Sequence, residues 1–209
     1  MRLEDLGTGV AALLYNGGDL NASAPNDAFK LTRDIREKYP LLGLLGGSTS
    51  GFILGASNLE VSAWLIVEEN REVLARFGIE PQLSAFDLLD REEQTRHTGK
   101  RVDGQPMPYG FEVLAAGTEL LVDFRLRPYA SDLEIGALVA AIETFAAADS
   151  TLGGQSARGF GLLFHETLIA PDGDMLALRE AYDAYLATHA DPLRQGLLDG
   201  TLATGKKVF

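Results

Sequence analysis

The stretch from residue 119 to residue 161, ELLVDFRLRPYASDLEIGALVAAIETFAAADSTLGGQSARGFG, contains the patterns of a strand, a helix and a glycine-rich loop in succession. In its first nine residues, apolar side chains alternate with side chains that are mostly charged. Leu120, Val122, Phe124 and Leu126 fall on one side, and Leu121, Asp123, Arg125 and Arg127 on the other. This alternation predicts a strand over 119–127 with one buried face and one charged face.

The middle of the stretch predicts a helix. Ser131 is a favourable N-cap, and acidic residues occupy the first turn, where the helix dipole favours them. Apolar residues then recur at helical spacing, which predicts a helix over 132–148; they are Leu133, Leu138, Ala141, Ile142 and Phe145. The glycine-rich loop follows directly, and 159–169 resumes as a predicted strand.

The rest of the chain extends this α+β pattern. Helices are predicted over 3–15, 26–38, 71–77 and 174–188. A strand is predicted over 59–67, and the glycine-rich segment over 41–51 is expected to pack tightly on the core. The chain is expected to end in a polar tail over 190–209. The order of elements predicts one domain, 1–209, with helices on one face of a sheet. A polar excursion over 79–110 interrupts it, and its length makes it the expected functional projection.

Composition excludes several kinds of site. The chain has no cysteine, and its three histidines are scattered in sequence, so we expect no disulfide, no metal site and no cofactor. The net charge of −12 speaks against bulk attraction to nucleic acid. No apolar run is long enough to span a membrane, and the N-terminus is acidic, so we expect no membrane partner and a cytoplasmic location.

The glycine-rich loop lies after a helix and before a strand, which is the reverse of the order in dinucleotide-binding folds. It also lacks the Lys-Ser/Thr pair of a phosphate-binding P-loop. Two interpretations stay open from spacing alone. The glycines can form a tight packing turn, or their backbone can hold a phosphate; the packing turn leaves Arg158 unexplained.

Four segments together resemble the repeat-associated (RAMP) proteins that form the backbone of multisubunit CRISPR effector complexes, in particular those of type IV and type III. They are YPLLGLLGG at 39–47, LLDREEQTRHTG at 88–99, FEVLAAGTELLVDFRL at 111–126 and LGGQSARGFG at 152–161. The last is the most specific, and the match covers most of 39–165. The family usually begins with a strand and a Gly-x-x-x-Arg-Gly-x-x-Arg helix, whereas residues 3–15 here predict a helix. We therefore expect that half on another polypeptide, or a reduced homologue.

The resemblance implies an RRM-like, ferredoxin-type sheet with a thumb-like insertion at 79–110. It also implies a non-catalytic subunit that binds CRISPR guide RNA, contacts other effector subunits and forms a helical filament with copies of itself. RNA would be held through its backbone, without base readout. The expected RNA-binding residues are Gly153, Gly154, Ser156, Arg158 and Gly159 on the loop, and Arg91, Arg96, Lys100 and Arg101 on the thumb.

Two other functions stay open. The acidic balance favours a mimic of a backbone subunit, one that joins or caps a CRISPR complex through protein contacts and can serve as its inhibitor. An RNA-cleaving enzyme would need a carboxylate such as Asp87 or Asp90 at the scissile phosphate. Dense charge on a projecting loop is more often a solvated surface. In type III members of the family an Asp in the N-terminal half cuts target RNA; because residues 3–15 do not match that half, the resemblance implies no target cleavage.

Overall fold

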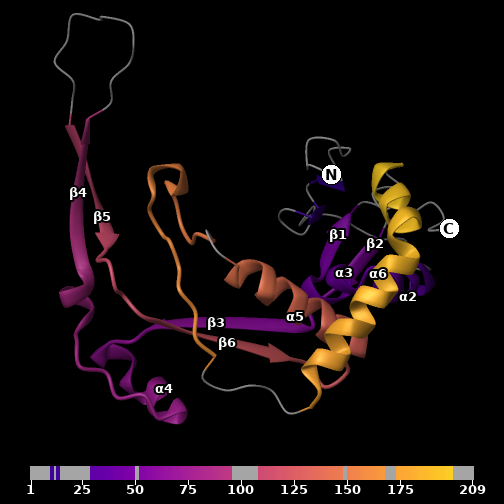
Figure 1. Cartoon of the computed structure of the whole chain (residues 1–209), viewed down its shortest axis with the longest axis horizontal. Coiled ribbons are helices and arrows are strands. Elements are labelled where there is room, and N and C mark those ends of the chain that lie inside the picture. Colours follow the sequence, from indigo (N-terminus) through magenta and orange to yellow (C-terminus); the bar gives the residue numbers. More distant parts are fainter. Residues whose placement is uncertain are drawn as a thin grey trace, which may run out of the picture. The chain divides into compact units, whose positions relative to one another are not determined.

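The computed structural model describes residues 10–11, 13–14, 29–49, 52–95, 108–147, 150–167 and 173–199. These residues form a mixed α+β structure, which confirms the predicted class (Figure 1). The helices are α2 (Phe29–Lys38), α3 (Pro40–Leu45), α4 (Arg71–Leu74), α5 (Asp132–Ala146) and α6 (Met175–Leu198). The strands are β1 (Gly47–Thr49), β2 (Phe52–Gly55), β3 (Leu59–Leu65), β4 (Leu89–Thr95), β5 (Pro108–Leu114) and β6 (Leu120–Leu126).

The chain divides into two compact units. The first unit comprises Met1–Glu60 and Leu126–Phe209, and the second comprises Val61–Arg125. The second unit contains the whole of the predicted insertion, 79–110, and extends beyond it on both sides. Strands pair as β1–β2, β3–β6 and β4–β5, so the described residues form three two-stranded sheets and no single ferredoxin-type sheet.

The core of the first unit is built mainly by helices. Its buried cluster comprises Val10, Leu13, Ile35, Tyr39, Leu42, Leu54 and Leu193. Leu193 lies in the predicted polar tail over 190–209. That prediction is corrected, because α6 remains helical through Leu198. Pro192 lies inside this helix and removes one backbone hydrogen bond. Leu193 and Leu197 continue the apolar stripe past it and pack on the core, which offsets that loss.

Helices α5 and α6 approach each other closely at Gly136. A Cβ atom built on Gly136 would lie 2.2 Å from the carbonyl oxygen of Leu178 and 2.9 Å from Cβ of Tyr182. Gly136 is buried and does not have the positive φ that would itself require glycine. The glycine is therefore explained by helix packing.

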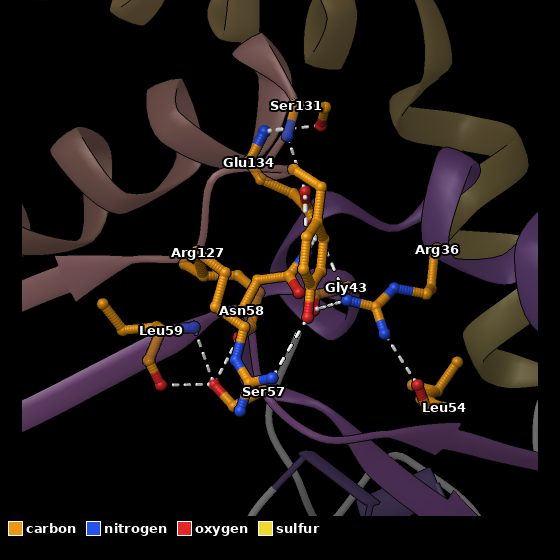
Figure 2. A network of polar contacts seen from close by, with 11 residues as sticks. Arg36, Gly43, Leu54, Ser57, Asn58, Leu59, Arg127, Ser131 and Glu134 are labelled. Carbon is orange, nitrogen blue, oxygen red and sulfur yellow. Dashed lines mark hydrogen bonds and ion pairs between the residues drawn. The ribbon is translucent and has the colours of Figure 1, made fainter.

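A buried polar network joins α2, α3 and the start of α5 (Figure 2). Glu134 is only 5% exposed, and its carboxylate accepts hydrogen bonds from the backbone of Ser131 and from Nδ2 of Asn58, at 2.8 Å and 3.0 Å. Nη2 of Arg36 lies 3.8 Å from Oε1 of Glu134 and donates to the carbonyl oxygen of Gly43. One carboxylate therefore caps α5 and ties it to two earlier parts of the chain.

Tyr39 connects this core to α6. Its side chain is 7% exposed, and its hydroxyl donates to the carbonyl oxygen of Leu193 at 3.3 Å. Burial, with a smaller contribution from Tyr185, raises the pKa of Tyr39 to about 12. Burial also raises the pKa of Tyr182 and of Tyr185.

These shifts predict a loss of stability at high pH. The unfolded Tyr39 ionises near pH 10 and the folded one near pH 12, so its contribution is complete below pH 10 and is lost between those values. The loss from Tyr39 alone is at most about 1.4 kcal/mol at pH 11, which corresponds to one pKa unit. Urea unfolding at pH 9 and pH 11 should show a smaller drop for Tyr39→Phe than for the wild type. An equal drop in the free energy of unfolding of both proteins would show that ionisation of Tyr39 does not cause the loss of stability at high pH.

The β3–β6 pair departs from the predicted burial. The amide of Arg127 donates to the carbonyl of Asn58 and that of Ile66 to the carbonyl of Glu119, which fixes one antiparallel register. In that register the apolar residues of the two strands share a face. The prediction that the apolar face of β6 is buried is wrong, because Val122 and Phe124 are 42% and 40% exposed. Val61 on the same face of β3 is 56% exposed.

Candidate functional site

The glycine-rich loop is closed at its neck by an antiparallel bridge between Thr151 and Leu162. The amide of Leu152 donates to Gly161 at 2.9 Å, and the amide of Leu163 donates to Ser150 at 3.2 Å. The predicted strand over 159–169 is therefore wrong for the described residues 159–167, which form only this bridge. A strand needs a partner along its whole length, and no partner lies beside the later residues of this segment in the described structure.

The tip of the loop presents unpaired backbone amides to solvent. Gln155 is left-handed (φ 61°, ψ 27°) and precedes the short 3-10 turn Ser156–Arg158. Among the residues that the structure describes, the five amides from Gly153 to Ala157 donate to no protein acceptor. Turns of this kind gather N–H groups into a concave surface that suits anions.

Arg158 is the only charged side chain between residues 150 and 164. Its Nη1 donates to Oε1 of Gln155 at 3.0 Å, and its backbone amide donates to the carbonyl of the same residue at 2.8 Å. Both contacts hold the arginine against the turn that carries the exposed amides. The loop thus has a local positive charge on a strongly acidic protein.

The glycines of the loop differ in whether the folded structure requires a glycine at that position. At Gly161, φ is 75° and an added Cβ would lie 2.0 Å from the carbonyl oxygen of Leu152, so the neck requires glycine. Gly153 and Gly159 have positive φ but open space around them. At Gly154, φ is not positive, and no atom lies within 4 Å of an added Cβ. Folding alone therefore does not explain Gly154, whereas close approach of a ligand to the backbone would.

The structure brings five of the predicted RNA-binding residues together on this loop, all of them exposed: Gly153, Gly154, Ser156, Arg158 and Gly159. The left-handed backbone of Gln155, which begins the turn at the tip of the loop, cannot be predicted from the sequence, because this conformation is uncommon at residues other than glycine and asparagine. His165 lies exposed just after the loop.

The other predicted site belongs to the second unit, where β4 and β5 form an antiparallel ribbon. Arg91 lies opposite Glu112, and its Nη2 is 4.0 Å from Oε1 of Glu93. Its guanidinium rests on Gly110, where an added Cβ would come within 2.7 Å of Nε. These carboxylates partly neutralise the charge of Arg91, so Arg91 should bind a phosphate less strongly than an arginine without acidic neighbours. The predicted residues Arg96, Lys100 and Arg101 lie outside the described residues.

The two carboxylates considered for catalysis have local structural contacts. Asp87 accepts from the amide of Ser84 at 2.7 Å in a capping box, and Asp90 accepts from the amide of Arg91 at 2.7 Å. No group of three or more His, Cys, Asp or Glu side chains within the described ranges could hold a metal ion.

None of the helices that the structure describes has the length and apolar character needed to cross a bilayer. No protein-family model and no curated protein matches this chain.

Proposed function

We propose that this protein is a non-catalytic backbone subunit, or the larger part of a split one, that binds CRISPR guide RNA in a class 1 effector complex. The observation that carries the proposal is the loop over 150–163, where exposed amides and Arg158 lie together. The partners that it implies are guide RNA, other effector subunits and further copies of this chain.

The chemistry of the loop suits a phosphate more than a base edge. Backbone amides donate hydrogen bonds without regard to base identity, and a guanidinium adds a charge-assisted contact. A guide RNA changes its sequence from one complex to another, so a subunit that holds it must avoid base readout. A loop that offers amides and one arginine meets this requirement.

The test is Arg158→Ala, compared with Arg194→Ala as the matched control. Arg194 is an exposed arginine on α6 of the same unit, so both variants lose one positive charge. We expect Arg158→Ala to weaken binding of single-stranded RNA by about tenfold, because a charge-assisted hydrogen bond is lost. The salt dependence of log K should fall in slope by about 0.7, and Arg194→Ala should change neither quantity appreciably.

Binding is measured by fluorescence anisotropy at several salt concentrations, with partner subunits supplied in a parallel series. Equal effects of the two variants would remove the loop from the binding site. An assembled particle that contains no RNA would overturn the proposal itself.

A second candidate function is a backbone-subunit mimic that joins or caps such a complex through protein contacts and so can inhibit it. The exposed apolar face of β3 and β6 favours it, because an uncovered face of this kind suits a protein partner. This function predicts that partner capture survives nuclease treatment and Arg158→Ala, and that Phe124→Ser abolishes it.

A further inference from the structure

The segment that follows the loop carries an aromatic ring that the fold does not use. Phe164 is 98% exposed, the highest value among the exposed large apolar residues of the described chain. Leu152 and Leu162, at the neck of the loop, are 51% and 54% exposed. Because Phe164 is almost fully exposed, its side chain contributes almost nothing to folding, and its ring is accessible to a ligand.

The position of Phe164 fits the loop chemistry. It lies two residues after Leu162, whose bridge to Thr151 fixes the neck. Phe164 also follows Arg158 closely in sequence, so the chain limits the distance between their Cα atoms to about 20 Å. A short stretch of single-stranded RNA spans such a distance, since one binding module commonly covers about 4–16 nucleotides.

We infer that Phe164 stacks on a nucleobase of the RNA strand whose phosphate is held by the loop; this inference rests on the proposed function. Stacking on an aromatic ring tolerates every base, because every base has a π-face. It therefore adds affinity without adding sequence preference. The loop holds the backbone, and Phe164 holds a base of the same strand.

The experiment uses the full chain and two probes of equal length: a single-stranded oligouridine RNA, and the same RNA with abasic nucleotides. The variants are Phe164→Ala, Phe164→Leu, which keeps an apolar side chain without a π-face, and Phe164→Trp, which keeps an aromatic ring. Phe145→Ala is the matched control, because Phe145 is 48% exposed on α5 of the first unit, outside both predicted RNA-binding segments.

We expect Phe164→Ala and Phe164→Leu to weaken binding of the oligouridine by about tenfold, Phe164→Trp to retain it, and Phe145→Ala to have no effect. On the abasic probe the loss should disappear. The salt slope should stay unchanged in all Phe164 variants, in contrast to Arg158→Ala, because stacking releases no counterions.

The outcomes separate the two proposals. If the wild type binds neither probe, alone or with the partner subunits supplied, both the proposed function and the stacking role are overturned. If Arg158→Ala weakens binding and Phe164→Ala does not, the stacking role fails while the proposed function stands. An equal loss on both probes also overturns stacking. If Phe164→Ala leaves RNA affinity intact but abolishes nuclease-resistant capture of a partner subunit, the stacking role is overturned and Phe164 is a protein contact.

Discussion

Replacing Glu134 with alanine should lower the free energy of unfolding by about 3–5 kcal/mol, the range found when one partner of a buried ion pair is removed. Glu134 is 5% exposed, and its carboxylate is the acceptor shared by Ser131 and Asn58. Without it, the side-chain amide of Asn58 loses its partner, the capping box of α5 is broken, and the guanidinium of Arg36 loses its countercharge.

Glu143→Ala is the matched control for this prediction, because it removes a carboxylate from the same helix. Glu143 pairs with Arg179 at 2.8 Å, but its side chain is 57% exposed, so its loss should cost less than about 1 kcal/mol. Urea unfolding followed by circular dichroism gives both values. Similar losses in the two variants would show that the network around Glu134 does not stabilise the fold.

Gly136→Ala should also destabilise the protein, by about 1–3 kcal/mol, as is usual when a packed interior is overfilled. In an exposed helix the same change would stabilise by about 1 kcal/mol, because alanine is the better helix former. The sign reverses here because the new methyl group would meet the backbone carbonyl of Leu178, which belongs to α6 and cannot rotate away as a side chain does.

Gly154→Ala provides the control for this change, because no atom lies within 4 Å of the added carbon and φ is not positive. Its unfolding free energy should match that of the wild type within about 0.5 kcal/mol. Thermal and urea unfolding of the two variants measure the difference. A stabilised Gly136→Ala protein would mean that α5 and α6 do not meet backbone to backbone at this glycine.

The features that can be predicted from the sequence depend on local chemistry. The helix predicted over 132–148 is observed as Asp132–Ala146, because Ser131 and Glu134 cap it from within the same turn. The strands predicted over 59–67 and 119–127 are also observed, since alternation is a local pattern. The loop residues can be found through glycine content and through Arg158, both visible in the sequence.

The features that cannot be predicted depend on distant partners. Alternation shows which residues share a face of β6, but not what covers that face, so the predicted burial of Val122 and Phe124 is wrong. The link between Asn58 and Glu134 spans 76 residues. Pro192 and the polar residues around it obscure the end of α6, where the packing of Leu193 decides the structure.

The bare face of β3 and β6 has a consequence for the abundance of this protein in a cell. Within the described residues the two strands pair only with each other, so an apolar surface and unpaired strand edges coexist in one place. Surfaces of this kind recruit chaperones and proteases or lead to aggregation. Under the proposed function, a copy that lacks its partner subunits should therefore be removed quickly, and the supply of those subunits, more than the rate of translation, should set how much of the protein accumulates.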